Sequence, residues 1–344
     1  MAAGSTIALR WKQRGRWAAL SWGELATAVG RLSAGWRAQG LARGDRVLVL
    51  ADARPRALLS VLALQAVGAT PLVVDPRVSP GRLGELLETV EVRFVHAGGE
   101  EQVDTFLDAG GDARRIVFDR PRGLGWRRDE RLVSLDVLER SEPPSPEAAP
   151  AERSAPLEIA RLAPDGWQIA LLHPEPHLHP AELPALSTAD TALLVEELAR
   201  PASLGLVVGR WLEERHQLVL PETPDSVAAD LTELAPSYLA ASAEFFETLR
   251  IRAIERFGAP GSLRRGLIGW AFRAPASVVA RLLVLRPLRR VLGLARVRQA
   301  VAAGAPSPEA HAFFAALGVA LAPAVEVATV ALVGPERLVA GSAC

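Results

Sequence analysis

Apolar and polar positions alternate regularly along the first third of the chain. Between Ser21 and Gly40 apolar residues recur at helical spacing, and Glu24 follows Ser21 by three residues, the capping-box pattern of a helix start. Short apolar runs between turn residues predict buried strands, with helical patterns between them. The predicted strands cover residues 45–51, 70–75, 92–97 and 114–119, and the predicted helices cover 54–67, 79–90 and 100–108. This alternation is typical of an α/β domain with a parallel sheet.

Residues 141–163 interrupt this pattern with a stretch rich in Pro, Ala, Ser and Glu, which predicts a linker. We therefore expect a first α/β subdomain at 1–140 and a second, incomplete one at 164–344. The second part is predicted to begin with a strand over 167–172 and a helix over 188–200. A further strand and three helices are predicted at 217–222, 225–236, 242–258 and from Ser307 onward.

Composition limits the class of protein. The chain has 344 residues, 49% of them hydrophobic, which is enough to bury a sizeable core. Acidic and basic residues number 39 each, so the net charge is zero and no nucleic-acid partner is expected. The single cysteine, Cys344, provides no disulfide framework and fits a reducing, cytoplasmic compartment. No signal peptide or membrane span is expected, because no apolar run is both long and uninterrupted.

Arginine is concentrated in the stretch at 281–298, where it is interleaved with Leu and Val. A basic amphipathic segment of this kind can lie on an anionic membrane surface, which would make the protein a peripheral membrane protein. The alternative is a solvated helix face beside the core, and this is the more frequent outcome in arginine-rich proteins.

Four segments resemble, in collinear order, the AMP-forming long-chain fatty-acyl-CoA synthetases. Residues 20–80 are similar to that family's first helix, its "G-x-x-x-G-D-R-V" strand and its "G-A-x-x-V-P-x-x-P" stretch. Later segments of the family are matched at 119–139, 216–249 and 294–321. The resemblance implies an α/β fold, namely the large N-terminal domain of the adenylate-forming proteins with two stacked α/β subdomains and mostly parallel sheets. It also implies that the barrel subdomain and the C-terminal domain of that family are lacking.

The resemblance places a glycine-rich phosphate loop directly after the strand at 167–172. The family uses ATP and Mg²⁺ to adenylate a carboxylate and then transfers the acyl group to coenzyme A, so its loop directs amides, hydroxyls and a lysine at phosphate oxygens. This chain has HPEPHLHP at 173–180, and no glycine between Gly166 and Gly205. Its prolines remove amide donors, and Glu175 adds negative charge where phosphate would lie.

Three interpretations of HPEPHLHP are open. The loop could still bind phosphate in an unusual way, or it could be an extended surface loop that no longer binds ATP. Alternatively, imidazole and carboxylate groups could bind a metal, with His173, His177, His179 and Glu175 as ligands. We expect the surface loop, because the prolines oppose an anion cradle and the spacing of the histidines matches no defined metal motif.

The family's tyrosine–glycine–x–threonine–glutamate stretch, which contacts adenine, phosphate and Mg²⁺, is also changed. An ungapped comparison puts Val325, Glu326, Ala328 and Thr329 at the tyrosine, glycine, threonine and glutamate positions. A gap would bring Glu326 to the glutamate position as a Mg²⁺ ligand, but the phosphate oxygens that complete such a site would have no loop to hold them. Lys12, the only lysine, is at the wrong end of the chain to replace the family's adenylation lysine.

One family element is partly retained, the turn that lies beside adenine. The resemblance makes this turn the predicted remnant of a nucleotide site, formed by Ala303, Gly304, Ala305 and Pro306. Small residues of this kind are also what a strand-to-helix connection needs before a helix that begins near Ser307. We prefer this structural interpretation, and we assign no catalytic or metal-binding residue.

Taken with the resemblance, these features predict an AMP-binding, acyl-CoA-synthetase-like pseudoenzyme that acts as a binding or interaction module. No cofactor is expected, although the family uses ATP and Mg²⁺. The candidate partners are an acyl chain or CoA-related ligand, another protein, a second copy of the chain, and a membrane surface at 281–298. The alternatives are an active fatty-acid–CoA ligase with a rebuilt site, and one half of a heteromeric ligase.

Overall fold

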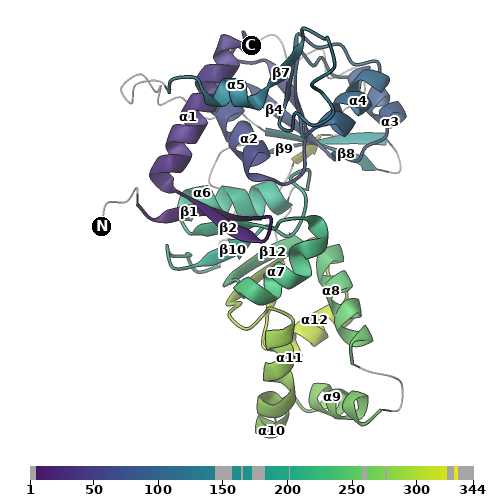
Figure 1. Ribbon diagram of the computed structural model, residues 1–344. Helices are drawn as coiled ribbons and strands as arrows, with labels where there is room; N and C mark the ends of the chain where they lie inside the picture. Colours follow the sequence, from purple (N-terminus) through teal and green to yellow (C-terminus); the bar gives the residue numbers. More distant parts are fainter. Residues whose placement is uncertain are drawn as a thin grey trace.

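Two β-sheets, each covered by helices on both faces, make up the protein (Figure 1). The computed structural model describes residues 5–143, 157–163, 166–172, 183–200, 202–257, 262–275, 277–323 and 329–331. Within these ranges, no helix combines the length and the apolar character that crossing a membrane requires.

The first sheet has eight strands in the order β15-β9-β8-β4-β3-β5-β6-β7. Its central pairs are parallel, whereas β9 runs antiparallel to both β8 and β15. The strands are β3 (Arg46–Leu50), β4 (Thr70–Val74), β5 (Phe94–Ala97), β6 (Arg115–Phe118), β7 (Leu132–Ser134), β8 (Leu157–Ala163), β9 (Gly166–Leu172) and β15 (Thr329–Ala331). The helices between them are α1 (Trp22–Ala38), α2 (Pro55–Val67), α3 (Pro80–Leu87), α4 (Glu100–Asp108) and α5 (Leu135–Glu139).

The second sheet has seven strands in the order β14-β13-β12-β10-β11-β1-β2, and only β2 is antiparallel to its neighbour. The strands are β1 (Ile7–Gln13), β2 (Arg16–Ser21), β10 (Thr191–Leu193), β11 (Gln217–Leu220), β12 (Tyr238–Ser242), β13 (Gln299–Ala303) and β14 (Leu321–Pro323). The helical segments are η2 (Ala202–Gly209), α6 (Arg210–Glu214), η3 (Pro224–Ser226), α7 (Val227–Leu234), α8 (Ala243–Glu255), α9 (Leu263–Arg273), α10 (Val278–Ala280), η4 (Arg281–Leu285), α11 (Arg286–Val291) and α12 (Pro308–Ala316).

The middle layer of the molecule is a hydrophobic core shared by both sheets. Alternate residues of a strand point to opposite faces, so in β3 Val47 and Val49 face this core while Leu48 and Leu50 face α3 and α4. The shared core also contains α1, α2, η2 and α6, together with one face of β10, β11 and β12. The layers are therefore helix, sheet, helix, sheet, helix, which confirms the predicted α/β architecture with two stacked, mostly parallel sheets.

Several local predictions are confirmed. Ser21 and Glu24 form the capping box at the start of α1, and the predicted strands and helices between residues 45 and 119 are present. Helix α2 ends at Gly68, whose φ of 86° lies in the left-handed region that glycine tolerates best. These elements follow from short-range patterns, so the sequence is sufficient to predict them.

The predicted domain boundaries differ from the structure. Residues 157–163, assigned to a linker, are β8 and pair with β4 in the first sheet. The hairpin of β1 and β2, assigned to the first subdomain, belongs instead to the second sheet. Each sheet thus contains strands from both predicted subdomains. Residues 1–140 and 164–344 therefore do not form two separate subdomains.

The helix predicted over 188–200 is wrong. Residues Thr191–Leu193 form β10, between β11 and β12, because pairing on both sides satisfies the strand's backbone groups within the sheet. The strand is preceded by Asp190, whose carboxylate accepts hydrogen bonds from Ser187 and from Ser237 Oγ (2.7 Å). Burial raises the pKa of Asp190, but these hydrogen bonds and the Arg298 guanidinium outweigh it and hold that pKa well below its usual range.

We expect His96 on β5 to make stability sensitive to acid. Its side chain is fully buried, neither ring nitrogen has a hydrogen-bond partner among the described residues, and burial, with Arg56 nearby, lowers its pKa to about 4. An unfolded histidine titrates near pH 6.5, so the unfolded state takes up the proton first, and stability falls as the pH drops from about 6.5 to about 4. His96→Leu should remove up to roughly 3 kcal/mol of this loss.

Urea unfolding at a series of pH values measures this effect. The control is His311→Gln, because His311 is exposed on α12 and its removal should leave the acid limb of the stability curve in place. An unchanged acid limb in the His96→Leu protein would contradict the assignment. At neutral pH the variant should be at least as stable as the parent, since an unpaired buried polar group is replaced by an apolar one.

Candidate ligand-binding cavities

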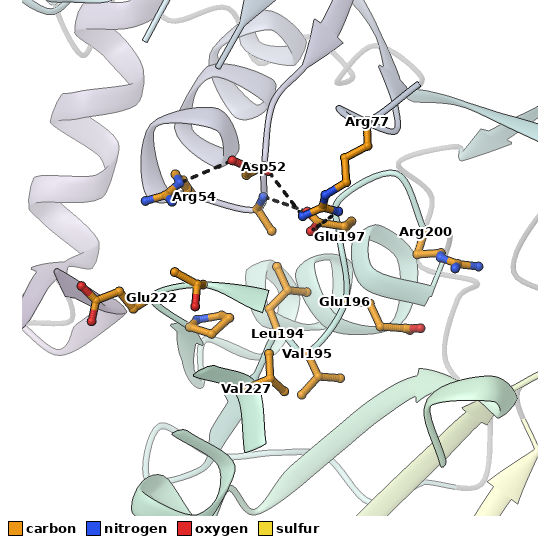
Figure 2. Close-up of a pocket in the computed structure, with 13 residues that line it drawn as sticks. Asp52, Arg54, Arg77, Leu194, Val195, Glu196, Glu197, Arg200, Glu222 and Val227 are labelled. Carbon is orange, nitrogen blue, oxygen red and sulfur yellow. Dashed lines mark hydrogen bonds and ion pairs between the residues drawn. The ribbon is translucent and has the colours of Figure 1, made fainter. Parts of the chain in front are cut away.

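A cavity of about 250 Å³ lies where strand ends from the two sheets meet (Figure 2). Its walls come from the residues after β3, β10 and β11, that is, from the carboxyl ends of parallel strands. In open α/β sheets this edge is the usual place for a ligand. The cavity is lined by Asp52, Ala53, Arg54, Arg77, Leu194, Val195, Glu196, Glu197, Arg200, Pro221, Glu222, Thr223 and Val227.

Glu197 joins the two sheets at this edge. One of its carboxylate oxygens accepts a hydrogen bond from the Ala53 backbone N–H (3.2 Å), and the other lies 3.2 Å from Nη1 of Arg77 (Figure 2). Partial burial lowers the pKa of Arg77, but the charge of Glu197 outweighs it and raises that pKa, so the guanidinium stays fully charged. Asp52 lies 3.7 Å from Arg54 Nε and 3.9 Å from Arg77 Nη2. Arg54 and Arg77 are thus already matched by carboxylates of the same cavity.

Glu196 and Glu222 hold backbone elements beside the same cavity. The Glu196 carboxylate accepts hydrogen bonds from Ser242 N (2.7 Å) and Ser242 Oγ (2.6 Å) at the start of α8. Glu222 accepts hydrogen bonds from the backbone N–H groups of Arg14 and Gly15, which form the tight turn between β1 and β2. Neither glutamate stands out in the sequence, because their partners are 46 and more than 200 residues away in the chain.

A second cavity of about 240 Å³ adjoins the first and shares Val195, Glu196, Arg200 and Val227 with it. It lies between α7 and α8 and is mostly apolar, with Leu231, Phe245, Leu249, Ala253 and Leu292 among its lining residues. Arg252 and Arg256 also line it; both side chains are exposed, and neither has an ion-pair partner among the described residues. The cavity therefore combines an apolar wall with unneutralised positive charge.

The predicted adenine turn connects β13 to α12. Ala303 is the last residue of β13 and pairs with Ser242 of β12, so the turn lies on the same sheet edge as the cavities. Gly304 has a φ of 92°, Ala305 is exposed and Pro306 is buried. Ser307 caps α12, which confirms the predicted strand-to-helix connection. None of the four predicted turn residues lines either cavity, and their role toward adenine stays a prediction.

The other predicted positions are only partly within the described structure. HPEPHLHP at 173–180, with its three histidines and Glu175, lies outside the described residues, as do Val325, Glu326 and Ala328. Thr329 begins β15 and pairs with Leu171 of β9 in the first sheet. Lys12, on β1, forms an ion pair with Glu233 (2.7 Å), and neither residue lines either cavity. In the described ranges no three His, Cys, Asp or Glu side chains form a group that could hold a metal ion.

Comparison with known proteins finds similarity to AMP-binding enzymes in the first part of the chain. Residues 2–160 match the family model of the AMP-binding enzymes. A curated relative, the 2-succinylbenzoate–CoA ligase of Escherichia coli strain K12, is 37% identical over 91 residues, which are 26% of this chain and 19% of the ligase. The medium/long-chain-fatty-acid–[acyl-carrier-protein] ligase FadD10 of Mycobacterium tuberculosis is 47% identical over 57 residues, 17% of this chain and 11% of that ligase.

This match to the AMP-binding enzymes covers slightly less than half of the chain. Solved structures share the fold of nearly the whole chain. The adenylation domain of a carboxylate reductase from Mycobacterium chelonae superposes with a TM-score of 0.69 at 18% identity, over 93% of this chain and 55% of that domain. For a benzoate CoA ligase from Burkholderia xenovorans LB400 the TM-score is 0.64 at 15% identity, over 93% and 57% of the two chains. The chain spans about half the length of those two structures.

We expect Glu196→Ala to destabilise the protein and loosen α8. The substitution removes both hydrogen bonds to Ser242, and hydrogen bonds to a charged group contribute about 1.5–3 kcal/mol to stability. Because Glu196 is only half-buried, we expect a loss of about 1–2 kcal/mol in the free energy of unfolding, measured by urea denaturation. Hydrogen exchange should rise in the first turn of α8.

Glu255→Ala, at the other end of α8, is the matched control. An acidic residue at a helix C-terminus is unfavourable, so this variant should be neutral or slightly more stable. Equal stability of the two alanine variants would show that Glu196 does not anchor α8.

Proposed function

We propose that this chain is a member of the AMP-binding superfamily that binds a long-chain fatty acid, or a similar acyl carboxylate, in the second cavity and does not adenylate it. The proposal makes the chain a non-catalytic relative of acid–CoA and acid–carrier-protein ligases. The observation that carries it is the opposite charge balance of the two adjoining cavities. The first is acidic and the second is basic and apolar.

The first cavity suits a nucleotide triphosphate poorly. Four carboxylates line it against three arginines, and those carboxylates already contact Arg54, Arg77 and backbone N–H groups. A triphosphate entering here would displace these contacts and meet net negative charge, which opposes binding in a partly buried site. In the sequence at 173–180, three prolines, which have no backbone N–H, stand where the family has a glycine-rich loop.

The second cavity suits a ligand with an apolar body and a single carboxylate. Its apolar lining would cover an acyl chain, and burial of each methylene contributes about 0.8 kcal/mol. Arg200 is near Glu244 (3.8 Å) and Glu196 is bound to Ser242, which leaves Arg252 and Arg256 as the cations available to the carboxylate. Arginine is well suited to this role because its planar group binds carboxylates through two hydrogen bonds.

Calorimetry with oleate and, separately, with ATP–Mg²⁺ tests the proposal. We expect heat from oleate, none from ATP–Mg²⁺, and no pyrophosphate released when both are present. The double variant Arg252→Gln, Arg256→Gln should bind oleate about tenfold more weakly, because exposed charge-assisted hydrogen bonds contribute at the low end of their range. Arg122→Gln, which changes an exposed arginine far from the cavity in sequence and absent from its lining, is the matched control.

Two outcomes would overturn the proposal in different ways. Pyrophosphate release that depends on the fatty acid would make the chain an active ligase with a rebuilt site. If the protein unfolds cooperatively but does not bind oleate, a fatty acid is not its ligand. Equal oleate affinity of the Arg252/Arg256 variant and the parent would place the ligand outside the second cavity.

A further inference from the structure

A helical extension projects from the second sheet on the side away from the first (Figure 1). It consists of α9, α10, η4 and α11, which follow one another between α8 and β13. Its inner side is tied to the protein, because Ile268, Ala271 and Leu285 are buried in the same core cluster as α8 and α12. On its outer side, apolar and basic side chains are both exposed.

Apolar exposure is concentrated on this extension. Among the described residues, eight of the fourteen large hydrophobic side chains that are exposed lie between positions 263 and 291. On α9 they occur at i, i+4 and i+7, on one face of the helix: Leu263 (89% exposed), Leu267 and Trp270. On α10, η4 and α11 they are Val278, Val279, Leu282, Leu283 (72% exposed) and Val291. Patches of this kind on a soluble surface mark sites of interaction.

Positive charge surrounds this apolar surface. Residues 262–298 contain nine arginines and no aspartate or glutamate. Arg273, Arg281, Arg286 and Arg290 are exposed and have no ion-pair partner in the described part of the chain. Spacings of four, three and four residues separate Val279, Leu283, Arg286 and Arg290, so the apolar side chains precede the charged ones along this helical segment.

We propose that α9, α10, η4 and α11 form a docking surface for an anionic lipid bilayer. The apolar side chains would enter the boundary between headgroups and acyl chains, and the arginines would contact lipid phosphates. A second copy of the chain is the less favourable occupant, because it would bring a second set of exposed arginines against Arg273, Arg281, Arg286 and Arg290. This surface is separate from the second cavity, so the inference goes beyond acyl binding and does not depend on it.

Sedimentation with lipid vesicles tests the proposal. We expect the whole protein to bind vesicles of phosphatidylcholine mixed with phosphatidylglycerol, to bind phosphatidylcholine alone weakly, and to lose affinity as salt rises. Arg286→Gln with Arg290→Gln should weaken binding roughly thirtyfold, from about 1 kcal/mol per arginine. Leu267→Ser with Leu283→Ser should weaken it at least about tenfold, because two apolar side chains no longer enter the bilayer.

Matched controls separate this surface from general effects. Ile251→Ser changes an exposed apolar side chain on α8, and Arg122→Gln changes an exposed arginine between β6 and β7. Neither substitution should alter vesicle binding. Thermal unfolding of each variant shows that it is folded. Equal binding to neutral and anionic vesicles, or unchanged binding by both double variants, would overturn the proposal. So would a lack of vesicle binding together with self-association that Leu267→Ser and Leu283→Ser abolish, because a second copy would then cover the surface.

Discussion

The hydrophobic layer between the two sheets is the constraint on which the rest of the structure depends. Trp211 of α6 lies in it, with its ring centroid 5.1 Å from that of Trp22 of α1, and its indole N–H donates to the Ala8 carbonyl of β1 (2.9 Å). One buried side chain thus touches a helix of the first half and a strand of the second sheet. Because a close-packed layer cannot shift without opening cavities, the carboxyl edges of the two sheets are held next to each other. The two ligand-sized cavities follow from that alignment.

The glutamates at this edge of the sheets mainly hold neighbouring structural elements in place. Glu196 holds the start of α8, Glu197 bridges to Arg77 and Ala53, and Glu222 holds the hairpin turn. These carboxylates already accept hydrogen bonds, so they are less available to bind a metal, and their negative charge opposes a phosphate. In the neighbouring cavity beside α8, Arg252 and Arg256 have no ion-pair partner among the described residues, and the proposed acyl carboxylate would bind there.

The helical extension is joined to the same architecture. Its inner face completes the core on the far side of the second sheet, so α9 to α11 can remain ordered while their outer face stays apolar and basic. An exposed apolar surface of this kind lowers the solubility of a protein unless another molecule covers it. If the cavity beside α8 binds an acyl chain and the extension contacts lipid, both sites lie in the same half of the molecule. A poorly soluble ligand would then be bound close to the membrane in which it partitions.

The sequence by itself determined the local elements of the fold. Helical spacing and the Ser21–Glu24 capping box fixed α1, and apolar runs fixed β3 to β6, because these signals act over a few residues. It also determined the composition of 173–180 and the arginine-rich segment. Only the tertiary structure decided the elements that depend on pairing between distant segments. Residues 157–163 form the strand β8 and not a linker, and Thr191–Leu193 form a strand and not a helix. It alone brought Glu196 to Ser242 and α7 to α8, because contacts between distant segments arise only when both sheets pack on one core.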